Sequence, residues 1–213
     1  MQVVRPWIPV HPGGHVGQLA PAAAMIGPTF AAVLAAAAGG DEDAFGMLWY
    51  DLQPRLLRYF RVAAAGAAED LASDTWLRII RSIGRFQGSE PAFQAWVFTI
   101  ARHQVLDWRR RAARKPTQDL PVTGLAEPLA PDDPAADAVE GASTQAALAL
   151  IATLPTDQAE AITLRVVAGL EVNRVAEIMG KRPGTVRVLT HRGLRRLAER
   201  LGADSGTHAR RVV

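Results

Sequence analysis

Apolar residues recur at every third or fourth position along most of this chain, which is the period of an amphipathic α-helix. Neither half of the sequence contains the alternating runs rich in β-branched residues that strands require. The pattern therefore predicts an all-α protein.

Four helices are expected in the first half of the chain. The first runs to Ala38 with Thr29 as its candidate N-cap, and the second begins after Asp41 or Asp43 and meets Pro54, which should bend or restart it. The third starts near Ala68 and has a stripe of apolar residues: Leu71, Trp76, Ile79, Ile80 and Ile83. Residues 84–91 should form a loop, and a last helix from about residue 93 carries Trp96 and runs into three consecutive arginines, 109–111.

The second half shows a sharper pattern. Three helices are expected, over residues 156–168, over residues 172–179 and from Thr185, as the N-cap, through residue 201. The buried positions of the first are Ala159, Ile162, Leu164 and Val166. Gly169 and Gly180 should end the first and the second helix. Two helices joined by a short turn that contains glycine form a helix-turn-helix, whose second helix enters the major groove of DNA. The apolar positions of that helix are Val186, Leu189, Gly193, Leu194 and Leu197, which leaves outside Arg182, Thr185, Arg187, Val188, His191, Arg192 and Arg195. The alternative is an ordinary helical hairpin with a solvated basic face.

A segment rich in proline and acidic residues separates the two halves. Residues 116–140 contain five prolines and six acids but no Lys or Arg, which predicts a flexible, semi-extended linker. The expected organisation is a disordered leader at 1–28, a domain at 29–115, the linker at 116–140, a domain at 141–202 and a tail at 203–213. Met25 is a second candidate start beside Met1.

Charge is distributed unevenly although the net charge is only +3. Residues 102–115 hold six basic residues against Asp107, and residues 181–213 hold nine against Glu199 and Asp204, while the intervening stretch is strongly acidic. Two separate basic clusters indicate a protein that grips a polyanion at two places. A solvated helix face is the simpler explanation for either cluster alone.

Composition narrows the classes of protein. The chain has no Cys, which excludes disulfide scaffolds and thiolate metal sites and fits a reducing cytoplasm. The longest apolar run, residues 30–38, is too short to cross a bilayer, so no membrane insertion is expected. His103 and His191 are the only histidines on expected helices, and neither has a carboxylate arrangement typical of a metal or a catalytic base. We therefore expect no enzyme activity, metal or cofactor.

The order and spacing of these elements resemble an extracytoplasmic-function (ECF) sigma factor, a compact bacterial factor that directs RNA polymerase to promoters. The residues that carry the resemblance run from 29 to 201. They include Asp70-Leu71, Asp74 to Arg78, Ala95 to Arg102, Leu154-Pro155, Val175 to Gly180, Gly184 to Arg187 and His191-Arg192. Ser73, Glu171, Val188 and Leu189 depart from the residues that are frequent in the family at those positions.

The resemblance implies a role for each surface. It implies that the helix with Asp70, Leu71, Asp74 and Arg78 binds core RNA polymerase. It implies that residues 84–93 with Trp96, Arg102, His103, Arg109 and Arg110 open and read the minus-ten element. It implies that the outer residues of the helix-turn-helix bind the minus-thirty-five element.

The implied partners are the β and β′ subunits of core polymerase, promoter DNA and, as an open alternative, an anti-sigma factor. Two other interpretations of the sequence remain: a stand-alone helix-turn-helix regulator, and a helical adaptor whose basic faces bind acidic partners.

Overall fold

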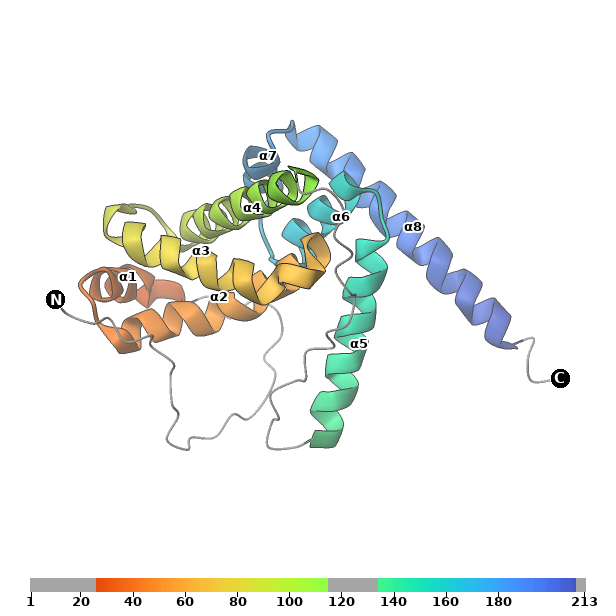
Figure 1. Cartoon of the computed structure of the whole chain (residues 1–213), viewed down its shortest axis with the longest axis horizontal. Coiled ribbons are helices and arrows are strands. Elements are labelled where there is room, and N and C mark those ends of the chain that lie inside the picture. The colour runs from red at the N-terminus through yellow and green to blue at the C-terminus, as the bar shows by residue number, and fades with distance from the viewer. Residues whose placement is uncertain (1–25, 115–133, 210–213) are drawn as a thin grey trace.

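A computed structural model describes the backbone of residues 26–114 and 134–209 and the side chains of residues 26–114 and 141–201. These residues form helices and no strands, which confirms the predicted all-α class. In the first half lie α1 (Phe30–Ala38), α2 (Glu42–Ala63), α3 (Ala68–Ser82) and α4 (Glu90–Arg114), with 3₁₀ turns at Gly27–Thr29, Ala65–Ala67 and Ile83–Arg85. In the second half lie α5 (Pro134–Ala152), α6 (Thr156–Ile162), a π-helical turn η4 (Thr163–Val167), α7 (Val172–Met179) and α8 (Pro183–Ala209) (Figure 1).

Several predicted segments lie outside the described residues: most of the leader, residues 116–133 of the linker, the end of the tail, and both candidate start methionines. The last residues assigned to the leader belong to the fold, because the backbone N–H groups of Ile26 and Gly27 donate to the Glu90 carboxylate at 2.6 and 2.9 Å. Helix α5 begins at Pro134, inside the range assigned to the linker. Proline is well tolerated at a first helical position, where its missing N–H would have had no helical partner.

The helices of the first half begin and end close to the predicted residues. Asp41 caps α2, and its carboxylate accepts a hydrogen bond from the Ala44 N–H at 2.8 Å. Thr29 occupies the N-cap position of α1, but its hydroxyl donates to the Ile26 carbonyl instead of capping the helix. Helix α2 does not restart at Pro54, because Leu52 and Leu56 on either side of it continue one buried stripe.

The second half departs from the prediction at three places. The first helix does not run to Ala168, because α6 ends at Ile162 and widens into the π-helical turn. Thr185 is not the cap of the last helix, since α8 already begins at Pro183. Gly180 does end α7 as predicted, with the left-handed φ of 64° that lets the chain turn toward α8.

Three apolar residues expected in the interior are exposed: Ile80, Val166 and Leu194, with exposed fractions of 53, 56 and 45%. Val166 leaves the apolar face because the wider π turn rotates it outward. Ile80 and Leu194 lie on the predicted period, but nothing packs deeply against that part of α3 or α8 among the described residues.

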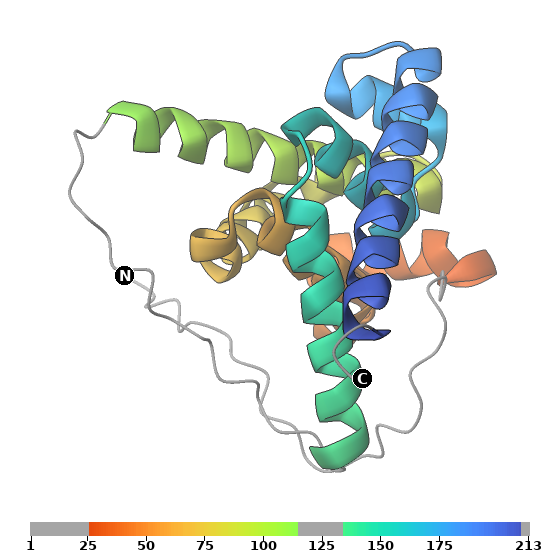
Figure 2. The ribbon, with the colours of Figure 1, turned by 90° about the vertical axis from the view of Figure 1, so that its right-hand side faces the viewer.

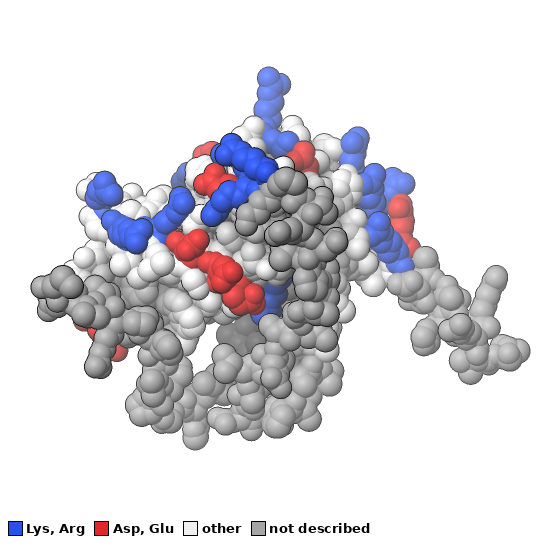
Figure 3. Space-filling model, viewed as in Figure 1, with Lys and Arg blue, Asp and Glu red and all other residues white. Residues whose placement is uncertain are grey.

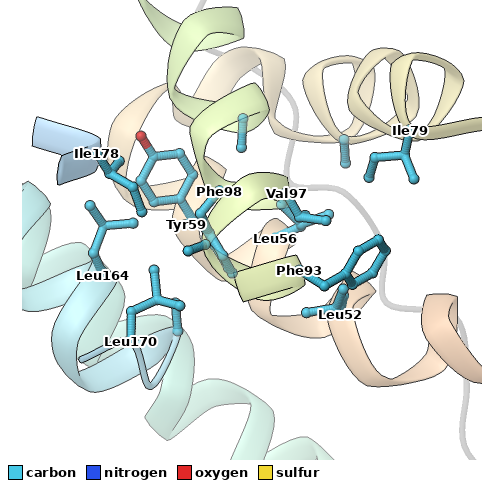
Figure 4. Packing of buried hydrophobic residues seen from close by; sticks show 14 of the residues in the cluster. Leu52, Leu56, Tyr59, Ile79, Phe93, Val97, Phe98, Leu164, Leu170 and Ile178 are labelled. Atoms are coloured by element: carbon cyan, nitrogen blue, oxygen red, sulfur yellow. The ribbon is translucent and has the colours of Figure 1, made fainter. Parts of the chain in front are cut away.

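One continuous core joins the two halves of the chain. Figure 4 shows Tyr59 and Phe98 of the first half beside Leu164, Leu170 and Ile178 of the second. A smaller cluster of Ile151, Leu154, Ala159 and Ile162 also takes in Val62 from α2. The sequence did not predict that the two halves pack together. Each half has its own amphipathic helices, and sequence periodicity does not specify which faces meet.

None of the described helices combines the length and the hydrophobicity needed to span a membrane.

Candidate nucleic-acid interface

Helix α3 presents a charged face to solvent. Asp70 and Asp74 are exposed one helical turn apart, and Arg78 follows after another turn on the same side. Figure 3 shows acidic side chains gathered over this helix and basic ones beyond its end. Leu71, predicted with this set, is only 3% exposed, so it holds α3 against the core and does not contribute to the exposed face.

An aromatic cluster joins the loop between α3 and α4, which carries Phe86, to the first turns of α4, which carry Phe93 and Trp96. The rings of Phe86 and Trp96 lie 5.2 Å apart, and Phe93 lies 5.2 Å from Phe86 and 5.5 Å from Trp96. Trp96 is half-buried, so one part of its ring packs on the core while the rest borders solvent. Both readings of Trp96, as a core residue and as a stacking surface, are therefore compatible with its position.

A solvent-facing recess of about 390 Å³ opens beside this cluster and is lined by Ser82, Arg85, Phe86, Gln87 and Trp96. Its walls combine two aromatic rings with hydroxyl, guanidinium and amide groups. Sequence reasoning marked the loop and Trp96 but did not single out Ser82, Arg85 or Gln87. Arg85 and Gln87 flank Phe86 directly in the sequence, which was the signal available.

Glu90 fixes the start of α4, directly after this loop. It is 6% exposed, and its two carboxylate oxygens accept the backbone hydrogen bonds from Ile26 and Gly27. Hydrogen bonds to a carboxylate are among the stronger ones in proteins, so Glu90 ties the chain before α1 to the loop and the recess. Sequence reasoning missed this residue because its partners are backbone groups 63 and 64 residues away.

The basic side chains predicted on α4 differ in what they contact. Arg102 donates to Glu160 of α6 at 2.8 Å, and Arg109 donates to the Ala63 carbonyl at 3.0 Å. Arg110 pairs with Asp107 at 3.0 Å on the surface, and His103 is exposed. Figure 2 shows the last turns of α4 projecting from the body of the protein. Exposed residues 110–114 thus offer charge to solvent, whereas Arg102 and Arg109 are engaged.

The helix-turn-helix presents all seven of its predicted outer residues. Arg182, Thr185, Arg187, Val188, His191, Arg192 and Arg195 are exposed on the turn and α8. Val186 is fully buried against the core. Figure 3 shows basic side chains gathered along α8.

Gly193 lets α8 lie unusually close to α6. A Cβ atom at this position would fall 2.5 Å from Cδ1 of Ile162 and 3.4 Å from Cβ of Gln158. The close approach fixes the angle at which α8 presents its outer face. In the part of the chain described with side chains, no three His, Asp or Glu residues are grouped to hold a metal ion.

Comparison with known families gives two matches. The family description "Sigma-70 region 2" matches residues 50–115, and "Sigma-70, region 4" matches residues 144–197. Both segments contain the surfaces described above.

Similar proteins include the ECF RNA polymerase sigma factor SigD of Mycobacterium tuberculosis, 32% identical over 195 residues that cover 87% of this chain and 90% of SigD. The ECF RNA polymerase sigma factor BldN of Streptomyces coelicolor is 35% identical over 173 residues, which cover 79% of this chain and 64% of BldN.

Two solved structures share the fold. CnrH in complex with the cytosolic domain of CnrY has a TM-score of 0.55 at 23% identity, covering 81% of this chain and 97% of CnrH. The sigma factor RpoE of Bartonella quintana in complex with the anti-sigma factor NepR has a TM-score of 0.56 at 24% identity, covering 75% of this chain and 98% of RpoE.

Proposed function

The chain belongs to the ECF sigma factors of bacterial RNA polymerase, and on this premise we propose how its surfaces divide the work of promoter-specific transcription initiation. The α3 face binds core polymerase, the aromatic recess and α4 hold the melted minus-ten strand, and the outer face of α8 binds the minus-thirty-five duplex. One observation carries the proposal: the two family regions each bear a separate basic surface, and the one on α8 is fully exposed.

The recess suits an unstacked base. Taking a base out of a duplex costs a few kcal/mol, and stacking on an aromatic side chain returns ~1–3 kcal/mol per base. Trp96 and Phe86 supply the aromatic surface, while Arg85, Gln87 and Ser82 supply groups that can hydrogen-bond to a base edge. His103 and Arg110 lie farther along α4, where they can contact the phosphates of the same strand.

The α8 face suits intact duplex. Arg187 and Arg192 offer guanidinium groups for bidentate contacts to guanine or for phosphate contacts, and the exposed His191 lies beside them. Arg195 already pairs with Glu199 at 2.8 Å on the surface, so we assign it to the phosphate backbone.

The α3 face suits a protein partner. Asp70 and Asp74 form a small negative surface on a rigid helix, and we assign their partner to the β and β′ subunits of core polymerase. Because a similar fold was solved with an anti-sigma factor, we propose the same class of inhibitory partner for this chain. The proposed place of action is the cytoplasm, and the proposed role is binding without catalysis.

In vitro transcription tests the proposal. Core polymerase with and without the chain is given a set of genomic promoters, each as intact duplex and with a pre-melted bubble at the minus-ten element. Template-selective initiation that requires the chain is expected. Trp96→Ala should lose initiation on duplex and regain much of it on the bubble, whereas Arg187→Ala with Arg192→Ala should regain little.

The matched control is Trp108→Ala, which removes another half-buried tryptophan of α4 that does not line the recess. Thermal melting of each variant shows that it is folded at the assay temperature. An equal response of both site variants to the bubble would contradict the division between the surfaces. Salt-sensitive binding to duplex without any effect on polymerase would favour a stand-alone regulator instead.

A further inference from the structure

Arg102 of α4 lies at the contact between the two halves of the chain. The proposed function assigns α4 to the minus-ten strand, and the resemblance to ECF sigma factors implies this role for Arg102 of α4, yet its guanidinium lies 2.8 Å from the Glu160 carboxylate of the second half. The two side chains are only 21 and 16% exposed, and 58 residues separate them in sequence. Removing one partner of a mostly buried ion pair destabilises the protein more than removing one partner of a pair on the open surface.

The surroundings of this pair reinforce the contact between the halves. Tyr59 of α2 is 1% exposed, and burial raises the pKa of its hydroxyl, with the charge of Glu160 raising it further. A small cavity of about 80 Å³ beside the pair is lined by Tyr59, Arg102, Arg109 and Glu160. Leu164 and Ile178 of the second half lie beside Tyr59 in the shared core (Figure 4).

The two proposed DNA surfaces lie too close together to reach both promoter elements. Elements centred near minus ten and minus thirty-five lie about 25 base pairs apart, or ~85 Å along B-form DNA at 3.4 Å per base pair. In the structure, Arg102 contacts α6, and α6 packs directly against α8. Packed helix axes lie ~8–10 Å apart, so the two proposed DNA surfaces are separated by a few helix diameters only. The halves must come apart before both elements can be bound at once.

We propose that Glu160 competes with the promoter strand for Arg102 and thereby holds the free chain closed. The inference rests on the proposed role of Arg102 at the minus-ten element. In the closed form the two surfaces differ: all seven α8 residues remain exposed, while Arg102 and Arg109 are engaged. The closed chain can therefore meet a minus-thirty-five duplex first, and the minus-ten strand binds only as Glu160 is released.

The first measurement is the distance between the halves in the full chain. Because the sequence has no Cys, Ala35→Cys and Ala198→Cys provide two unique, exposed attachment points for spin labels on α1 and α8. With the Arg102–Glu160 pair intact, the two labels should give one narrow distance distribution. Glu160→Gln should add longer distances. The control Glu177→Gln removes the same charge from an exposed Arg–Glu pair on α7 and should leave the distribution unchanged.

The second measurement is the affinity for a fluorescent 12-nucleotide pool of random single-stranded DNA. Apparent affinity scales with the fraction of the chain that is open, so Glu160→Gln should bind on the order of tenfold tighter than Glu177→Gln. The exchange of Arg102→Glu with Glu160→Arg should restore the narrow distance, because the pair is rebuilt with its charges reversed. It should not restore strand affinity, since the arginine is now on the other half.

Each outcome decides the proposal. Unchanged distances in Glu160→Gln overturn the closure, and longer distances without tighter strand binding than Glu177→Gln overturn the competition. If the wild-type chain initiates transcription while either result is obtained, only this inference fails. If it supports no initiation on any template, the proposed function fails whatever the distances show.

Discussion

At the scale of single residues, Gly193 decides how closely α8 can pack. Gly193→Ala places a methyl group 2.5 Å from Cδ1 of Ile162, so the isoleucine or the helix must move. Overpacking of this kind costs ~1–3 kcal/mol, which for a chain of this length lowers the melting temperature by roughly 2–4 °C per kcal/mol.

Gly184→Ala is the matched control for this prediction. It lies on the same helix with no atom within 4 Å of its added Cβ, and alanine favours the helix by ~0.5–1 kcal/mol. Thermal unfolding followed by circular dichroism compares the two variants. Equal melting temperatures would mean that Ile162 yields without cost.

Val188 is an exposed apolar residue among charged neighbours. It is 47% exposed on the outer face of α8, between Arg187 and His191. In the major groove, an apolar side chain distinguishes thymine through its C5-methyl group. We predict that Val188→Ala weakens binding to the tightest duplex from a random pool, and that replacing one dT of this duplex by dU weakens binding of the wild type but not of Val188→Ala. Equal sensitivity of both proteins to every dT-to-dU change would contradict the contact.

At this scale the sequence identified the outer residues of the helix-turn-helix, because their exposure follows from helical period alone. It placed Leu71 in the apolar stripe of its helix and missed Glu90, whose role depends on backbone groups 63 and 64 residues away. Leu71 lies on the buried side of the helix that carries Asp70, and Glu90 is buried by the segment before α1.

At the scale of elements, α3 offers a sharp test of the polymerase surface. Asp70→Lys with Asp74→Lys should weaken binding to core polymerase about tenfold or more, because like charges across a protein interface are strongly unfavourable. The control Glu69→Lys reverses an adjacent charge in the same helical turn, where the side chain faces Arg61 of α2 at 3.7 Å. Both proteins should keep their helix content by circular dichroism. Undiminished binding by the double variant, measured by fluorescence anisotropy with labelled chain, would remove α3 from the interface.

Helix positions were predictable where local signals were strong. The α7 helix begins and ends at the predicted residues, and its end is set by Gly180, which adopts the left-handed conformation that stops it. The π-helical turn after α6 was not predictable, because it depends on tertiary contacts: Leu164 packs into the shared core, and Arg165 donates to the Leu170 carbonyl at 2.6 Å. Such a turn leaves no mark in a pattern of hydrophobic and polar residues.

At the scale of the whole molecule, the sequence indicated two separate units and the structure joins them. Three of the residues that meet at the junction, Ala159, Ile162 and Leu164, were predicted to be buried. Their partners were not predicted, since a stripe facing its own half and one facing the other half have the same period. The charge pattern was similarly incomplete, because Arg102 was counted in a basic cluster while Glu160 was counted in an acidic stretch, and the structure pairs them.

A shared core has a consequence for unfolding that the tryptophans can report. All five tryptophans lie at or before residue 108, so their fluorescence follows the first half only. Leu164→Ala empties a fully buried position in the second half and should cost ~2–5 kcal/mol. If the halves unfold as one unit, the midpoints of the tryptophan signal and of the ellipticity at 222 nm should both shift downward together, by roughly 4–20 °C. Leu194→Ala removes the same atoms from an exposed position on α8 and should change neither curve noticeably. If the midpoint of the tryptophan transition does not change while the ellipticity is lost at a lower temperature, the first half is stable by itself. The contact around Arg102 and Glu160 would then be too weak to hold the chain closed.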